Sequence, residues 1–149
     1  MSVNRHLSRT IAMQSLFEWD FHPDGDILEI AHRVMKPVEK DVDIEYLDRV
    51  VKGTAKVIKE IDELIANAAP EWPLEQISVI DKSILRLAGY ELLKDLDIPP
   101  KVAINEAVEI AKTFGGENSS KFINGVLGTL YRQSDRFVDE EDKPKIEPE

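Results

Sequence analysis

Two short stretches of this chain carry side chains that could bind the phosphates and bases of a nucleic acid. In the first, Arg5 and Arg9 lie four residues apart, so on a helix they share one face. They would lie in the first turns, where free backbone N–H groups and the helix dipole attract phosphate. Residues 1–17 contain no acidic residue. The pattern predicts either a phosphate-binding surface or two arginines that only aid solubility.

The second stretch is a helix start near the C-terminus. Asn118, Ser119, Ser120 and Lys121 could hold an anion there, or this helix start could be ordinary capping. Phe122 follows at the edge of the apolar stripe of its helix, where a ring can serve as a platform for a base. Packing beneath the neighbouring loop is the alternative for this ring. Phe17 is a similar case on the first helix, and there the sequence alone favours packing.

The residue types that would support catalysis are missing or scattered. His6, His22 and His32 fall in separate segments, without the i, i+4 spacing of a zinc-binding helix. The chain has no cysteine, which excludes disulfides, a thiol nucleophile and thiolate metal ligands. No glycine-rich phosphate loop or nucleophile elbow is present. We therefore expect a protein that is not an enzyme and holds no metal or cofactor.

The overall charge argues against a simple electrostatic nucleic-acid binder. Twenty-nine acidic residues outnumber 19 basic ones, which gives a formal net charge of −10 and a pI near 4.8. A basic field over the whole protein is thus missing. Six acids and two lysines in residues 139–149 predict that residues 135–149 form an acidic, disordered tail. The tail would either aid solubility or compete with RNA for the basic end.

The apolar spacing predicts an all-α protein, with helices that position both stretches. Asn4 caps a helix to about residue 21, a short helix follows from 27 to 36, and Asp43 caps a third helix running to residue 68. As one continuous rod, the third helix would be about 39 Å long. Its one glycine, Gly53, disfavours the helix by about 1 kcal/mol relative to alanine, so we expect it where helices pack closely.

Three further helices follow a proline-rich boundary at residues 70–73. Ser78 or Asp81 begins the first of them, and prolines 99 and 100 open the second. Gly115 suits the left-handed position that ends that second helix, and Asn118 or Ser119 begins the third. We predict an N-terminal helical lobe over residues 1–69 with a basic first helix, a C-terminal helical lobe over 70–134, and the tail beyond.

Three segments together resemble the NusB family of bacterial transcription antitermination factors. They are residues 12–19, AMQSLFEW; residues 84–93, ILRLAGYELL; and residues 98–127, IPPKVAINEAVEIAKTFGGENSSKFINGVL. The last combines two helix starts, a helix stop and a glycine within a helix in thirty residues. The resemblance covers roughly residues 5–131. It implies two three-helix bundles packed roughly perpendicular to each other, in agreement with the two predicted lobes.

The resemblance also implies a function and a set of site residues. NusB-like proteins bind single-stranded boxA RNA of the nascent rRNA transcript together with NusE, a ribosomal small-subunit protein, within the transcription elongation complex. The RNA-binding positions of the family correspond here to Arg5, His6, Arg9, Phe17, Asn118, Ser119, Lys121 and Phe122. Asn118 stands where the family often has an acid, which removes one repulsion of phosphate.

The protein partner is expected at the start of the helix after the boundary. The resemblance selects Asp81 for this contact, and proximity selects Glu75; stabilisation of the helix N-terminus is the alternative role for both. A helical protein–protein adaptor or a homodimer without direct RNA binding remains the alternative function. A polar start without a signal peptide and the lack of an 18-residue apolar run predict a cytoplasmic protein that has no membrane contact.

Overall fold

A computed structural model describes residues 3–138 of the 149-residue chain. Within that range every regular element is helical and no strand is present, which confirms the predicted all-α class. Seven α-helices and two short 3-10 helices (η) occur in the described residues. In chain order they are α1 Arg5–Phe21, α2 Ile27–Met35, η1 Lys36–Asp41, α3 Ile44–Lys56, α4 Ile58–Ala68, η2 Leu74–Gln76, α5 Val79–Leu93, α6 Pro100–Phe114 and α7 Ser119–Gln133.

Several helices begin where the sequence predicts, because a polar side chain replaces a missing backbone partner. Asn4, Asp43 and Ser78 each accept a hydrogen bond from the backbone N–H three residues later, at 2.9, 3.1 and 3.1 Å. Pro100 occupies the first position of α6, where the N–H that proline lacks would have no helical partner. Ser78 is therefore the N-cap of α5.

The expectation of one continuous helix from residue 43 to 68 is wrong. Val57 leaves the helical conformation (φ −111°, ψ 23°) and separates α3 from α4. The two parts share α5 as a neighbour and differ in the others, since α3 also packs against α1 and α2, whereas α4 also packs against α7. The close approach expected at Gly53 is confirmed, because a Cβ there would lie 2.3 Å from Cζ of Tyr90.

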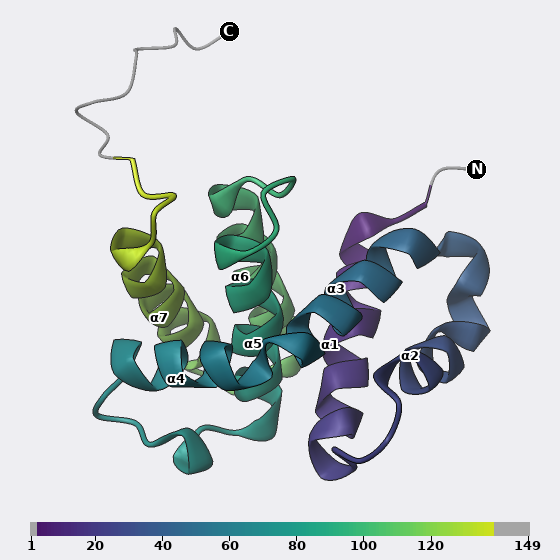
Figure 1. The fold of residues 1–149 in the computed structure, drawn as a ribbon, viewed down its shortest axis with the longest axis horizontal. Helices are drawn as coiled ribbons and strands as arrows, with labels where there is room; N and C mark the ends of the chain where they lie inside the picture. The colour runs from purple at the N-terminus through teal and green to yellow at the C-terminus, as the bar shows by residue number, and fades with distance from the viewer. Residues whose placement is uncertain (1–2, 139–149) are drawn as a thin grey trace, which may run out of the picture.

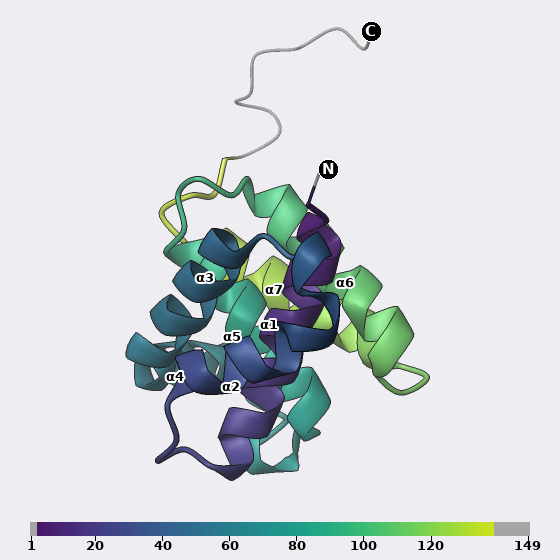
Figure 2. The same ribbon diagram turned by 90° about the vertical axis from the view of Figure 1, so that its right-hand side faces the viewer.

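The helices form two groups that share α5. Figure 1 shows α1 and α2 in one half and α6 and α7 in the other; α3 runs from the first half towards the centre, and α4 continues into the second. The view turned by 90° places α5 in the middle, with α4 on one side and α6 on the other (Figure 2). Helix α5 contacts α1, α3, α4, α6 and α7. A helix covered on so many sides must bury even its polar side chains.

Arg86 of α5 shows how such a buried polar side chain is satisfied. Its guanidinium donates two hydrogen bonds of 2.7 Å to Asp62 of α4 and one of 2.7 Å to Asp20 of α1. Lys82 also lies 3.4 Å from Asp20. Burial would raise the pKa of Asp20, but the Arg86 hydrogen bond and the Lys82 charge outweigh it and lower this pKa. The network ties α1 and α4 to the central helix.

Arg136 extends the fold past the end of α7. Its guanidinium donates to the backbone oxygens of Glu91, Leu92, Asp95 and Ile98 at 2.8–3.3 Å, which satisfies the last carbonyls of α5 and the loop after it. Arg136, near the start of the predicted tail, is thus bound to the end of α5, and Phe137 packs against Tyr131 of α7. The acidic residues 139–149 lie outside the described residues.

Candidate nucleic-acid interface

The start of α1 presents two of the predicted RNA-binding side chains to solvent. Arg5 is exposed, donates to Asp43 at 3.1 Å, and its guanidinium lies 4.2 Å from the centre of the Tyr46 ring. His6 is also exposed, and its Nδ1 lies 2.5 Å from Glu106 of α6. Both residues can reach a ligand, but a carboxylate already contacts each of them.

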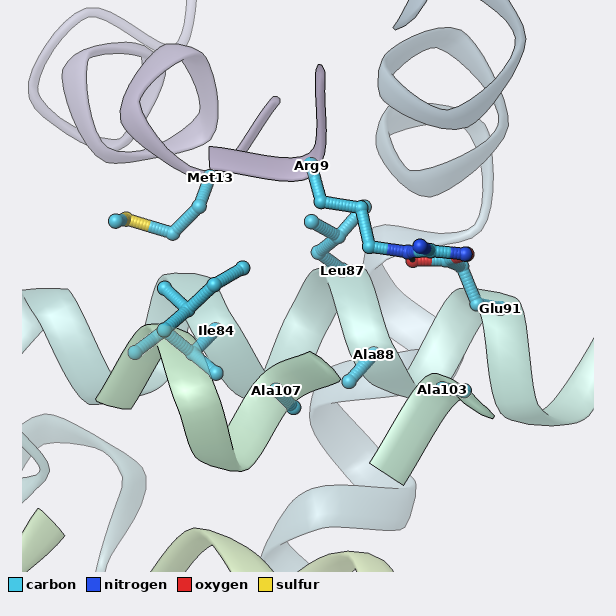
Figure 3. Close-up of a pocket in the computed structure, with 9 residues that line it drawn as sticks. Arg9, Met13, Ile84, Leu87, Ala88, Glu91, Ala103 and Ala107 are labelled. Atoms are coloured by element: carbon cyan, nitrogen blue, oxygen red, sulfur yellow. Dashed lines mark hydrogen bonds and ion pairs between the residues drawn. The ribbon is translucent and has the colours of Figure 1, made fainter. Parts of the chain in front are cut away.

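Arg9 is buried, although it lies only one helical turn from Arg5. Its side chain is 3% exposed and reaches from α1 to the carboxylate of Glu91 on α5, with three hydrogen bonds of 3.0–3.2 Å (Figure 3). Burial would lower the pKa of Arg9, but the hydrogen bonds and charge of Glu91 outweigh it and raise this pKa. The expected pair of exposed arginines is therefore not formed, and RNA contact by Arg9 stays a prediction.

Tyr46 of α3 lies beside Arg5 and Arg9, and also beside Arg49, which is not among the residues predicted from the sequence. The guanidinium carbons of Arg5, Arg9 and Arg49 lie 4.2, 5.2 and 5.7 Å from the centre of its ring. Burial raises the pKa of the Tyr46 hydroxyl, and the negative charge of Glu91 adds to this effect. Arg49 is partly exposed and pairs with Asp95 at 3.2 Å. Tyr46 and Arg49 lie three residues apart on a capped helix, and this spacing could have predicted that the two side chains meet.

The start of α7 has fewer internal partners. Asn118 occupies the cap position, but its side chain makes no capping hydrogen bond. Lys121 is exposed, and within residues 3–138 its ammonium group has no ion-pair partner. Phe122 is half-buried and packs against the edge of the core. Asn118 and Lys121 thus leave polar groups available to a ligand beside an aromatic ring.

Ser119 is the exception at this helix start, because its hydroxyl both accepts and donates a hydrogen bond within the protein. Its hydroxyl accepts from the backbone N–H of Gly116 at 2.8 Å and donates to Asp81 at 3.1 Å. Gly115 is not in the expected left-handed conformation, since its φ of −85° and ψ of 179° are extended. Glycine is required there for space instead: a Cβ would lie 2.4 Å from Cβ of Ser119 and 2.8 Å from the backbone oxygen of Ala111.

A cavity of about 290 Å³ opens beside Phe122. Trp72, which precedes η2, forms one wall, and its ring centre lies 6.2 Å from that of Phe122 in an edge-to-face arrangement. Half of the Trp72 side chain is exposed. In the sequence, this tryptophan lies within the proline-rich boundary at residues 70–73 and is not among the predicted site residues. A large aromatic residue between two prolines was the signal that could have placed it in a site.

Phe17 lies at the other end of α1 from Arg5, about 18 Å along the helix axis for twelve residues. Its ring packs edge to face against that of Phe21, 5.2 Å away, and the Phe21 side chain is more than half exposed. The neighbouring Asp20 contacts Lys82 in the first turns of α5. The end of α1 that carries Phe17 thus contacts the first turns of α5, at the opposite end of the helix from Arg5.

The two residues predicted to contact a protein partner differ in exposure. Glu75, in η2, is exposed. Asp81 is 9% exposed and accepts the hydrogen bond from Ser119 through Oδ2. Both precede or begin α5, but only Glu75 is available to another protein as the structure stands.

Within residues 3–138, no cluster of three or more histidine, aspartate or glutamate side chains is placed so that it could hold a metal ion. No helix in that range is long and apolar enough to cross a membrane.

The fold and these surfaces define an all-helical protein, with two helix groups around the shared α5 and with exposed cationic and aromatic side chains near two helix N-termini. The model described as the NusB family matches residues 6–132. A transcription antitermination protein NusB from Clostridium botulinum (strain Kyoto / Type A2) is 42% identical over 144 residues, covering 86% of this chain and 99% of the relative. One from Dehalococcoides mccartyi (strain CBDB1) is 40% identical over 132 residues, covering 87% and 91%. This chain belongs to the NusB family.

Solved structures give the same result for the fold. A T. maritima NusB structure superposes with a TM-score of 0.82 at 36% identity, covering 90% of this chain and 94% of that one. A structure of the antitermination factors NusB and NusE in complex with dsRNA matches with a TM-score of 0.75 at 26% identity, covering 86% and 96%. The relatives are named for a role in transcription and not for a chemical reaction.

Proposed function

We propose that this chain is a transcription antitermination factor that binds single-stranded boxA-type RNA together with the ribosomal protein NusE during rRNA transcription. Family membership over nearly all described residues supports the role in transcription. A family neighbour solved with NusE and dsRNA supports the two kinds of partner. Such a factor acts on nascent transcripts within the elongation complex, so we place it in the cytoplasm.

The observation that carries RNA binding is the start of α7. Lys121 is exposed and has no ion-pair partner within residues 3–138. Asn118 is exposed, its side chain makes no capping hydrogen bond, and the rings of Phe122 and Trp72 lie beside it. A cation and helix N-terminal N–H groups can hold a phosphate, while aromatic rings can stack on the adjoining base. At the start of α1, Arg5 and His6 offer a second point of contact with the strand.

A protein partner resolves the conflict between a net charge of −10 and RNA binding. At physiological salt, charges further apart than about 8 Å are largely screened, so only local basic groups act on the RNA. A basic protein bound to the acidic surface would extend the cationic track. We place Glu75 in that contact because it is exposed next to the start of α5. Asp81 stabilises the same region, because it accepts a hydrogen bond from the Ser119 hydroxyl and so connects the starts of α5 and α7.

Titration of a labelled boxA-type RNA with the protein, with and without NusE, tests the proposal. We expect binding that weakens with salt and strengthens with NusE. Lys121→Ala should lower RNA affinity and flatten the slope of log K against log salt by about 0.7, the value for one lost contact on a single strand. Lys59→Ala, which removes an exposed lysine from α4, is the matched control and should leave the slope unchanged.

The contact with NusE is tested by Glu75→Lys. Complementary charge at the edge of an interface speeds association, so its reversal should lower NusE affinity mainly through the association rate. RNA binding in the absence of NusE should stay the same or become slightly stronger. Wild-type NusE affinity in this variant would remove Glu75 from the contact.

The alternative function is a helical adaptor or homodimer that does not bind RNA. It is favoured by one observation: Arg5, Arg9 and Arg49 all have carboxylate partners within the protein. An adaptor would bind NusE without any salt-dependent RNA affinity. A homodimer would sediment as twice the chain mass of 16.9 kDa at micromolar concentration.

A further inference from the structure

A row of lysines crosses one face of the molecule without forming ion pairs. Residues 49–59 contain four basic residues and no acidic one, although the whole chain carries a net charge of −10. Lys52, Lys56 and Lys59 are exposed, and within residues 3–138 none of them has an ion-pair partner. We call these three residues the lysine strip.

The lysine strip spans the junction of α3 and α4. Lys56 follows Lys52 by four residues, which places the two side chains on one helix face about 6 Å apart along the axis. Lys59 comes one turn later, just past the break at Val57. Figure 1 shows α4 continuing from α3 with no other helix in front of them. The spacing is close to that of successive phosphates in a strand, so each ammonium group can neutralise one phosphate.

The surroundings of the lysine strip favour a phosphate backbone over a protein partner. Between Ile44 and Trp72 no large apolar side chain is exposed. The buried centre of a protein–protein interface is rich in aromatic and apolar residues and poor in lysine. A surface that offers only ammonium groups can neutralise phosphates, but it cannot read bases. Only Lys56, in the last turn of α3, has a local reason for its charge.

The lysine strip continues the cationic side chains at the start of α1. Arg49 lies one turn before Lys52 on α3. Its guanidinium and that of Arg5 both lie near the ring of Tyr46. Arg49 is itself paired with Asp95 at 3.2 Å, so it links the two surfaces and adds little free charge. Figure 2 places α3 and α4 on the opposite side of α1 from the loop between α6 and α7. The strip would thus hold a different part of the strand from the start of α7.

We propose that the lysine strip binds the phosphate backbone of single-stranded RNA that flanks the segment held at the starts of α1 and α7. The strand leaves the start of α1, passes Arg49 and runs along α3 to Lys59. The contact does not depend on base sequence, because only phosphates are touched. This inference rests on the proposed RNA binding and extends it to a longer stretch of the transcript.

The test compares labelled RNAs by fluorescence anisotropy over a range of salt. One RNA carries only the boxA-type segment, and two others extend it by an oligouridine flank on the 5′ or on the 3′ side. We expect one of the two flanks to steepen the slope of log K against log salt by about 2, since each of three contacts on a single strand adds about 0.7. The short RNA does not reach the strip, so its slope should be insensitive to Lys59→Ala. Equal slopes for all three RNAs would overturn the proposal.

Replacement of all three strip lysines by alanine should abolish the effect of the flank and leave binding of the short RNA unchanged. The three side chains are exposed on helices, where alanine is the most favourable residue, so the variant should stay folded. A melting curve checks this. A flank effect that survives in this variant would overturn the proposal and leave the strip to an acidic segment of a protein.

The matched control replaces Lys36, Lys40 and Lys112 by alanine. These lysines are exposed on η1 and α6, outside the lysine strip, and their loss changes the net charge by the same amount. The control should keep the flank effect. Equal loss of the effect in both variants would mean that net charge and not the strip attracts the flank, and the proposal would fail. Absence of binding to the short RNA would instead count against the proposed function.

Discussion

Substitution of Arg9 should destabilise the protein strongly, because it leaves the carboxylate of Glu91 buried without a cation. Glu91 is 1% exposed, and within residues 3–138 Arg9 supplies all three hydrogen bonds to its carboxylate oxygens. Breaking one partner of a buried pair typically costs about 3–5 kcal/mol. For a domain near this size, 1 kcal/mol shifts the melting temperature by about 2–4 °C. Arg9→Met should thus lower the melting temperature by roughly 10–15 °C.

A second substitution separates the lost ion pair from lost packing. Glu91→Leu in the Arg9→Met protein removes the unpaired carboxylate, and replacement of a whole buried pair by apolar side chains is often close to neutral. The double variant should therefore recover most of the stability. Arg5→Met is the control: its ion pair with Asp43 is exposed, so its loss should cost less than about 1 kcal/mol.

Thermal melts of the four proteins, combined with RNA titrations over a range of salt, complete the experiment. Arg5→Met should flatten the salt slope by about 0.7, whereas the double variant at Arg9 and Glu91 should keep the wild-type slope. The reasoning would be refuted by an Arg9→Met protein that melts like the wild type and binds RNA with a reduced slope. That result would mean that Arg9 reaches a phosphate and that the ion pair contributes nothing to the fold.

Three further outcomes follow from contacts described above. Gly115→Ala should lower the unfolding free energy by about 1–3 kcal/mol in urea denaturation, since the new methyl group overlaps Ser119; unchanged stability would contradict the space argument. Because the pKa of Asp20 is lowered in the folded protein from 3.8, its stabilising pair with Arg86 is complete above about pH 4 and is lost as pH falls through the lower folded value. Melting temperatures measured against pH should fall in that acid range, and more shallowly for Asp20→Asn; parallel curves would rule out this contribution. Phe122→Ala should weaken RNA binding by about 1–3 kcal/mol in a titration, and a loss of melting temperature with wild-type affinity would assign the ring to packing alone.

The features predicted correctly from the sequence are those with local causes. Asn4, Asp43 and Ser78 begin helices because a short polar side chain reaches a backbone N–H only three residues away. The break at Val57 has no such local cause. The apolar stripe of the segment continues through it, and what differs on the two sides lies far away in the chain: besides the shared α5, α3 packs on α1 and α2, whereas α4 packs on α7.

The site was harder to predict because exposure depends on residues far away in the chain. Arg5 and Arg9 look equivalent in sequence, yet the partner that buries Arg9 lies 82 residues later. The spacing of two arginines cannot tell solvent from an acidic residue on a neighbouring helix. Gly115 shows the same limit: glycine marked a helix end correctly, but its reason is the position of Ser119 and not the sign of φ. Trp72 gained its significance only when the fold set its ring beside that of Phe122.

The last turn of α5 joins the two ends of the described chain. The side chain of Glu91 holds Arg9 near the beginning, and its backbone oxygen accepts from Arg136 near the end. Such long sequence separations make folding depend on distant contacts, which slows it relative to simple helical bundles. During synthesis, this turn cannot be completed until residue 136 has left the ribosome. The two helix groups should therefore reach their final stability together and late in synthesis. A fragment that stops at the end of α7 would lack Arg136, the cation that donates hydrogen bonds to the last carbonyls of α5.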